Sequence, residues 1–359
     1  MASIGRYAGG SRAARFAFGA SAPYLSRVEN LAMGNHARAL TAFVFVVLVC
    51  PLGLCGQTDP RAEMIAFVQA VAAHARAADP GFGVFPQNAA ELGADPEYMA
   101  AVTGMGQEDT YYGYKKDGKA TPAAVTAQIE ADLDRFVAAG KLVLTVDYTF
   151  KDEDVPAFNR KAVKRTNLAY ARSSARGYVP YCTVRNLNSL TVNPGHEPAP
   201  NEPAIAEWSQ VRDFLYQLQH GEGQDRQAFL TDVAASGFDL VVTDYSFDGS
   251  GEQELTAEEI ATLKGALNGK LLAYLSIGEA EDYRWYWQEA WDADRDGIPD
   301  DGAPAWLDRA NPDWPGNYKV RFWDPQWQAL VMQYLDRILA QGFDGVYLDL
   351  VDAYQYYVP

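Results

Sequence analysis

The stretch "GFDGVYLDLVDAYQYYVP", residues 342–359, decides the predicted fold. A glycine that can stop a helix is followed by a short apolar run, which is typical of a parallel strand buried on both faces. Asp349 and Asp352 come where this strand ends. In (β/α)₈ barrels the catalytic groups lie at the carboxyl ends of the strands. The stretch therefore predicts a barrel strand with two acids placed for chemistry.

The chain after residue 57 alternates between segments of helix period and segments of strand period. Helices are expected over residues 59–79, 121–140, 161–177, 226–237, 256–269 and 324–342. Strands are expected within residues 82–88, 99–113, 141–148, 178–185, 213–219, 238–245, 270–279 and 343–350. Eight such strands favour a closed (β/α)₈ TIM barrel over an open sheet. Between the last two strands, residues 280–323 are expected to form a long aromatic loop.

Residues 188–207 are rich in Pro and Asn and indicate a linker between residues 58–187 and 208–359. The alternative is two separate four-stranded domains. A half-barrel would expose two long strand edges, which disfavours that alternative.

Residues 1–57 are expected to be a basic N-terminal region followed by a signal peptide or an anchor. The apolar run has about 16 residues before it is broken by Pro51, which is short for a membrane span and typical of a signal sequence. Export to the cell surface, the periplasm or the outside of the cell is therefore predicted. Contact with a membrane is expected only through an uncleaved segment or a lipid anchor at Cys55.

Composition excludes several classes of function. The formal net charge of −17 argues against a nucleic-acid partner, because phosphate binding needs a basic face. Three cysteines and four histidines do not form a disulfide framework or a zinc motif. No phosphate loop or dinucleotide fingerprint occurs, so no cofactor for catalysis is expected. We expect a monomer.

Polar residues follow most of the predicted strands, and carboxylates dominate among them. Pairs of carboxylates carry out glycoside hydrolysis, and aromatic side chains pack against sugars. A structural hydrogen bond or core packing is the alternative for each of them. The candidates are Gln87, Asn88, Glu108, Asp109, Asp147, Asp244, Tyr245, Glu279, Tyr283, Trp323, Asp349 and Asp352.

The loop "DADRDGIPDDG", residues 292–302, has the pattern of a calcium loop. Asp292, Asp294 and Asp296 stand at positions 1, 3 and 5, a glycine follows, and Asp300 stands at position 9. Position 12 is Ala303, so the bidentate glutamate of an EF-hand is missing. The loop predicts a structural Ca²⁺ site, and the alternative is a solvated acidic loop.

Longer motifs resemble one enzyme family. They include "GFDLVVTDYSFDGS", "LAYLSIGEAEDYRWYW" and "GFDGVYLDLVDAY" after residue 236, and "GMGQEDTYYGY" and "GKLVLTVDYT" before residue 151. These motifs resemble glycoside hydrolase family 114, the endo-α-1,4-polygalactosaminidase family, in its exported bacterial branch. The resemblance implies that Asp349 is the nucleophile and that Glu108 is the general acid/base, with Asp109 as the alternative to Glu108. It further implies a sugar site lined by Asp244, Tyr245, Glu279, Tyr283, Asp352 and Asp147.

The order of the motifs differs from the order in that family. Residues 58–187 resemble the family's C-terminal half, and residues 208–359 resemble its N-terminal half. The simplest account is a circular permutation, with residues 188–207 joining the family's usual ends. The alternative is an artefact of the gene sequence.

The leading hypothesis is an exported glycoside hydrolase that cleaves α-1,4-linked galactosamine-containing polysaccharide by a two-carboxylate, retaining mechanism. An acidic protein suits a cationic chain. The alternatives are a non-catalytic carbohydrate-binding barrel and a non-functional rearranged product.

Overall fold

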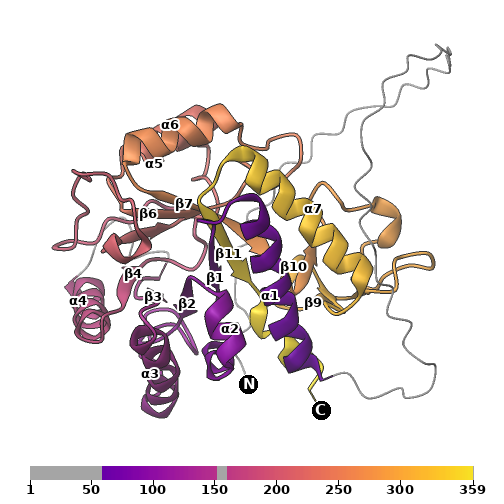
Figure 1. Ribbon diagram of the computed structural model, residues 1–359, viewed down its shortest axis with the longest axis horizontal. Coiled ribbons are helices and arrows are strands. Elements are labelled where there is room, and N and C mark those ends of the chain that lie inside the picture. The colour runs from indigo at the N-terminus through magenta and orange to yellow at the C-terminus, as the bar shows by residue number, and fades with distance from the viewer. Residues whose placement is uncertain (1–58, 152–159, 359) are drawn as a thin grey trace, which may run out of the picture. The chain divides into compact units, whose positions relative to one another are not determined.

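Strand β11 (Gly345–Asp349) lies in the middle of a five-stranded parallel sheet in the computed structural model, which describes residues 59–151 and 160–358. The order in this sheet is β1-β11-β7-β6-β5 (Figure 1). Its other strands are β1 (Gly83–Pro86), β5 (Phe214–Tyr216), β6 (Leu240–Thr243) and β7 (Lys270–Ser276). The first and last parallel strands of the described chain are thus direct neighbours.

A second parallel sheet has the order β2-β3-β4. Its strands are β2 (Gly104–Glu108), β3 (Leu142–Asp147) and β4 (Val179–Cys182). A parallel bridge between Gln87 and Gly106 joins the two sheets where β1 meets β2. At the other end, β4 packs against β5, and the rings of Tyr181 and Phe214 lie 5.6 Å apart. The eight predicted strands therefore form a TIM-barrel-like arrangement of parallel strands.

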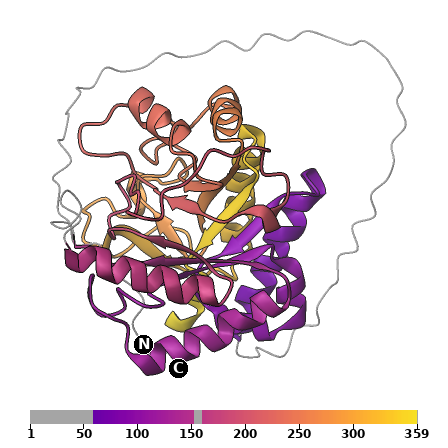
Figure 2. The same ribbon diagram turned by 90° about the vertical axis from the view of Figure 1, so that its left-hand side faces the viewer.

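The predicted helices are present, and acidic or hydroxyl side chains cap most of them. They are α1 (Pro60–Ala78), α3 (Ala123–Ala138), α4 (Arg160–Ala175), α5 (Arg226–Ala234), α6 (Ala257–Leu267) and α7 (Pro325–Gln341). Asp59, Asp225, Thr256 and Asp324 accept backbone N–H groups at four helix starts, as expected of N-cap residues. Figure 2 shows α3 and α4, in purple and magenta, on one flank of the strands.

Short elements complete the chain and carry part of the site. They are the helix α2 (Pro96–Ala101) and the 3₁₀ turns η1 (Ala90–Ala94), η3 (Trp208–Gln210), η4 (Glu289–Trp291) and η5 (Val351–Tyr356). Helix α3 has no side-chain cap. Its N-cap is Pro122, and the preceding Thr121 hydroxyl donates to the carbonyl of Asp109 at 2.6 Å.

The expected aromatic loop contains a small antiparallel sheet. Its order is β8-β10-β9, with β8 (Glu279–Glu281), β9 (Leu307–Asn311) and β10 (Trp314–Val320). Indole rings hold this layer on the core: the centroids of Trp306 and Trp327 lie 4.9 Å apart. The expectation of a loop was wrong here because β10 contains Pro315 and Gly316 and pairs irregularly with β9.

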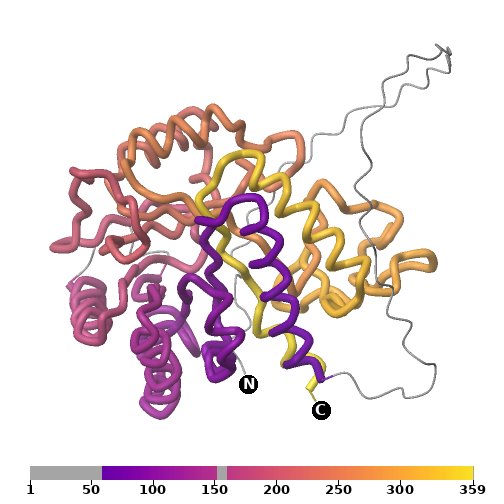
Figure 3. The backbone as a smooth tube through the Cα atoms, in the orientation of Figure 1, coloured from indigo at the N-terminus to yellow at the C-terminus, as the bar shows by residue number. Residues whose placement is uncertain are grey.

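Helix α1 packs against both α7 and η5. Figure 3 shows the indigo helix α1 beside the yellow helix α7. The start of the described chain therefore lies against its end, and both lie next to β11. Residues 1–58, which hold the predicted signal peptide or anchor, are outside the described residues. Among residues 59–151 and 160–358, no helix combines the length and the hydropathy that crossing a membrane requires.

Candidate active site

The parallel register places Asp349 at the exit of β11, opposite Ser276 of β7. The Tyr274 hydroxyl donates to Asp349 Oδ2 at 2.8 Å, and the N–H of Leu350 donates to Oδ1 at 2.8 Å. The pKa of Asp349 is raised to about 7, first by burial and then by the charge of Glu108. The hydrogen bond from Tyr274 acts in the opposite direction, because it stabilises the carboxylate.

Glu108 ends β2, on the far side of β1 from β11. Its Oε1 accepts from the Tyr148 hydroxyl, and its Oε2 accepts from Asn88 Nδ2 at 3.3 Å. Asn88 has a φ of 60° and also receives the backbone N–H of Glu108 on its Oδ1 at 3.1 Å. The left-handed turn after β1 therefore orients the Glu108 carboxylate.

Two further carboxyls face this pair. Burial raises the pKa of Asp352 well above its ordinary value, and the charges of Asp349 and Glu108 add to that rise. Glu279 Oε1 accepts from Asn311 Nδ2 and from the Tyr356 hydroxyl, each at 2.9 Å, and burial raises its pKa. The structure thus brings together four predicted residues: Glu108, Glu279, Asp349 and Asp352.

Asp109 is adjacent to Glu108 in sequence, but its carboxyl has different hydrogen-bond partners. Its φ of 57° turns the chain, and its Oδ1 accepts from Arg185 Nη2 at 2.8 Å. Its pKa is raised to about 7, chiefly by burial, while the Arg185 charge opposes the rise. Arg185 also donates to Asp117 at 2.8 Å, so Asp109 belongs to a structural ion network.

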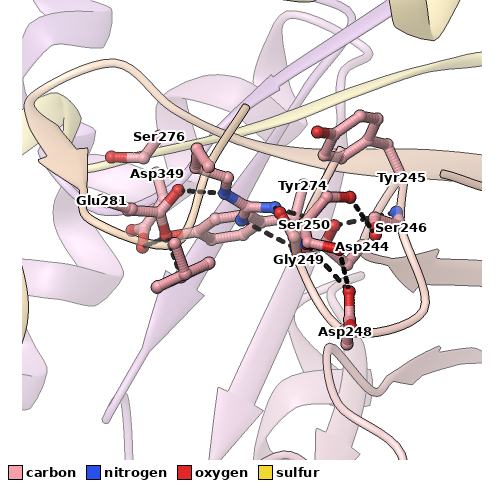
Figure 4. A network of polar contacts seen from close by, with 12 residues as sticks. Asp244, Tyr245, Ser246, Asp248, Gly249, Ser250, Tyr274, Ser276, Glu281 and Asp349 are labelled. Atoms are coloured by element: carbon pink, nitrogen blue, oxygen red, sulfur yellow. Dashed lines mark hydrogen bonds and ion pairs between the residues drawn. The ribbon is translucent and has the colours of Figure 1, made fainter. Parts of the chain in front are cut away.

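Asp244 and Tyr245 lie in the network drawn in Figure 4. Arg284 donates to both oxygens of Asp244, at 2.9 and 2.7 Å, and to Glu281 Oε2 at 2.6 Å. Tyr245 is fully buried, with its ring centroid 4.6 Å from that of Tyr334. Tyr283 is 45% exposed and donates to Glu281 Oε1 at 2.5 Å.

The remaining predicted residues support neighbouring segments. Buried Asp147 accepts the N–H groups of Tyr111 and Tyr112 at 2.6 and 2.7 Å, which fixes the loop after β2. Gln87 Oε1 accepts from the Tyr216 hydroxyl at 2.9 Å in the interior. Trp323 is half-buried against Tyr357, with ring centroids 4.8 Å apart.

Three tyrosines fasten η5 and the residue after it, next to the cluster. Tyr354 donates to Glu91 of η1, Tyr356 donates to Glu279 of β8, and Tyr357 donates to the carbonyl of Val320 in β10 at 3.0 Å. Since Asp352 lies within η5, these bonds to three separate elements hold it against Asp349. Hydrophobic pattern alone gave no signal for this fastening.

The acidic loop at residues 292–302 lies after η4. Three carboxylate oxygens, one each from Asp292, Asp294 and Asp296, lie within 4.8 Å of one another. Asp300 differs, because its Oδ2 accepts the N–H of Ala293 at 2.7 Å. Gly297 has a φ of 83°, which matches the tight turn that the motif needs at position 6.

Most of the carboxyl cluster at the strand exits lies in a segment that matches a known enzyme family. Residues 195–357 match the model of glycoside-hydrolase family GH114. The GH114 match contains Asp349, Asp352 and Glu279, whereas Glu108 precedes it. It therefore supports the resemblance for the second half of the chain, in which Asp349 lies. The role of Asp349 as nucleophile stays a prediction.

Two uncharacterized proteins are similar to this chain over about 150 residues. One, from Deinococcus radiodurans, is 48% identical over 158 residues, which are 44% of this chain and 45% of that protein. The other, from Thermotoga maritima, is 41% identical over 146 residues, which are 40% of each. The chain spans less than half the length of these curated relatives.

Two solved structures are similar over about a third of the chain. The glycoside hydrolase domain of PelA from Pseudomonas aeruginosa is 22% identical, with a TM-score of 0.26, over 35% of this chain and 42% of that one. Ega3 from Aspergillus fumigatus, in complex with galactosamine, is 24% identical, with a TM-score of 0.25, over 34% and 40%. Scores this low support neither the fold nor the activity.

Proposed function

We propose that this protein is an exported glycoside hydrolase that cleaves α-1,4-linked galactosamine-containing polysaccharide. The observation that carries the proposal is the GH114 match over residues 195–357, which includes Asp349 at the exit of β11. The carboxyl cluster around Asp349 supports it, because paired carboxylates are what glycoside hydrolysis requires. In this cluster Glu279 and Asp352 are buried, whereas Glu108 and Asp349 are partly exposed.

In the proposed reaction Asp349 is the nucleophile and Glu108 is the general acid/base. Asp349 attacks the anomeric carbon while Glu108 protonates the leaving glycosidic oxygen, and a glycosyl-enzyme ester forms. Glu108 then takes a proton from water, which attacks the same carbon and releases Asp349. Retention requires the two carboxyl groups to lie ~5–5.5 Å apart when substrate is bound.

The electrostatics of the cluster favour a cationic sugar. Burial raises the pKa of Asp349 and of Asp352, and the charge of Glu108 adds to both rises. An ammonium group between them would lower both pKa values and restore the charged nucleophile. We propose that Asp352 and Glu279 bind the aminosugar, and that Asp244, Tyr245, Gln87 and Asp147 act by holding the walls of the site.

We also propose that the eight parallel strands form a closed barrel and that the chain is a circular permutant of the GH114 order. The adjacency of β1 and β11, and of α1 and η5, supports this. In a relative with the usual GH114 order, the segment equivalent to η5 would lead directly into the segment equivalent to α1.

A separate proposal concerns the loop at residues 292–302. Asp292, Asp294 and Asp296 would bind a structural Ca²⁺, with Asp300 acting on the backbone of the loop. The spacing of the three carboxylates and the turn at Gly297 support it. This ion would stabilise the loop and take no part in the chemistry.

The deciding experiment measures new reducing ends when the purified full-length chain is incubated with de-N-acetylated galactosaminogalactan. We expect release by the wild type and a loss on the order of 10³-fold or more for Asp349→Asn. Asp336→Asn, an exposed change on α7, is the matched control and should retain activity. A folded wild type that binds this polysaccharide without cleaving it would instead support the carbohydrate-binding hypothesis.

A further inference from the structure

Tyr274 stands directly below Asp349 in the sheet. In the parallel pair β7–β11, Ser276 is opposite Asp349, and Tyr274 is opposite Tyr347. Side chains two residues apart on a strand point to the same face. The Tyr274 side chain therefore rises on the face that carries Asp349, where its hydroxyl reaches Oδ2 at 2.8 Å.

A buried ion network lies beside the Tyr274 ring (Figure 4). The Arg284 guanidinium lies 5.8 Å from the ring centroid and is itself held by Asp244 and Glu281. The side chains of Arg284 and Glu281 are only 1% and 2% exposed. Because these groups are paired and packed, the tyrosine ring has a rigid neighbour and its hydroxyl has a fixed direction.

The groups that face Asp349 are otherwise acidic or neutral. They are Glu108 of β2, Glu279 of β8, Asp352 and Tyr356 of η5, and Tyr347 of β11. Among residues 59–151 and 160–358, the side chain of Asp349 receives hydrogen bonds only from Tyr274 and from the N–H of Leu350. A carboxylate surrounded by like charges depends on such donors to stay ionised.

We infer that Tyr274 is a positioning residue that favours the ionised form of Asp349 and fixes the plane of its carboxylate. This role rests on the proposed function, since it matters to catalysis only if Asp349 is the nucleophile. The hydrogen bond itself can be tested without any substrate.

Removing the hydroxyl has a defined effect on the pKa of Asp349. The bond stabilises the charged form, so its loss must raise the pKa above the present value of about 7. A hydrogen bond to a charged group favours the ionised form by about 10- to 150-fold, and a tenfold change corresponds to one pH unit. We therefore expect Tyr274→Phe to move the titration midpoint upward by about one to two pH units.

Tyr347→Phe is the matched control. Tyr347 is a fully buried tyrosine opposite Tyr274, and its hydroxyl has no partner among the described residues. The substitution removes the same atom from the same layer without removing a hydrogen bond to Asp349. Its titration midpoint should match that of the wild type.

The experiment follows the carboxyl ¹³C shift of Asp349 against pH in full-length protein labelled at aspartate, with Asp349→Asn identifying the signal. An upward shift in Tyr274→Phe and none in Tyr347→Phe is the expected result. Equal midpoints in Tyr274→Phe and the wild type would overturn the inference. If Tyr274→Phe does not fold, 3-fluorotyrosine at position 274, a stronger donor of the same shape, should lower the midpoint, and an unchanged midpoint would overturn the inference equally.

Hydrolysis assays separate this inference from the proposed function. In an active enzyme, the acidic limb of kcat/KM should move to higher pH in Tyr274→Phe while KM changes little. A wild type that shows no hydrolysis, together with a shifted NMR midpoint, would contradict the proposed function and leave the hydrogen-bonding role intact.

Discussion

Glu108 and Asp109 are adjacent in sequence, yet their carboxyls have different partners. Glu108 accepts from Tyr148 and Asn88 and raises the pKa of Asp349 by its charge, whereas Asp109 is paired with Arg185. We expect Glu108→Gln to fold normally and to lose on the order of 10²–10⁴-fold in kcat/KM, which is the usual contribution of a general acid/base. Kinetics with the polysaccharide measure this loss.

Asp109→Asn is the comparison for that prediction. It should keep most of its activity per folded molecule, but it should lower the free energy of unfolding by on the order of 3 kcal/mol, because the largely buried Arg185 would lose a partner. Thermal unfolding measures the second effect. Loss of activity in a stable Asp109→Asn protein, with an active Glu108→Gln protein, would exchange the two roles.

The residues that sequence analysis placed in the cluster share one signal. Glu108, Asp349 and Asp352 each stand where an apolar run ends, and the ends of parallel strands meet at one edge. Tyr274 gave no such signal, because a tyrosine inside an apolar strand has the pattern of a core residue. Arg284 lies in a loop, and its partner Asp244 is 40 residues away, so only the folded chain shows their pairing.

At the scale of elements, the loop at residues 292–302 gives a test by metal removal. If Ca²⁺ binds the native loop, 10 mM CaCl₂ should raise the unfolding temperature of the chelated protein by about 2–4 °C. The reason is that the ion would bind the folded loop and not the unfolded chain. Differential scanning calorimetry with and without EDTA measures the change.

The matched control for calcium is the double variant Asp294→Asn with Asp296→Asn. It should unfold at the same temperature with or without Ca²⁺, because two of the three clustered carboxylates are neutral. If Ca²⁺ raises the unfolding temperature of the variant and of the wild type equally, the ion binds elsewhere. If Ca²⁺ does not change the unfolding temperature of the wild type, the loop is a solvated acidic loop that binds no ion.

Elements with a regular period were predicted well, and those without one were not. Helices α1 and α7 follow from apolar spacing and from an Asp-Pro start. The sheet β8-β10-β9 does not, since Pro315 and Gly316 interrupt the alternation in β10. The packing of Trp306 on Trp327 secures that sheet, and such a contact between distant residues has no local sequence pattern.

For the whole molecule, eight strand-period segments alternating with six helix-period segments predicted parallel strands but did not show which strands lie side by side. Chain order alone makes β4 and β5 neighbours, and it leaves the neighbour of β1 undetermined. The observed pairing of Gly83–Pro86 with Gly345–Leu348 joins the first strand to the last. A closed barrel of eight strands implies that pairing, and so does the resemblance of the two halves to one family in reversed order.

Because β1 pairs with β11, we expect the chain to tolerate a circular permutation that restores the order of the two halves in the family. A variant that begins near residue 195, runs to residue 357, and continues through a short Gly-Ser linker into residues 59–190 should fold and keep its activity within about tenfold. The new joint is short because α1 packs on η5, and the new opening lies in the irregular segment before β5. Circular dichroism, thermal unfolding and reducing-end release measure the outcome.

A control opened inside β3, between Leu144 and Thr145, should not fold, because it breaks a central strand of the second sheet. If the rejoined chain aggregates while the parent folds, β1 and β11 are not neighbours in solution, and the permuted barrel must be abandoned.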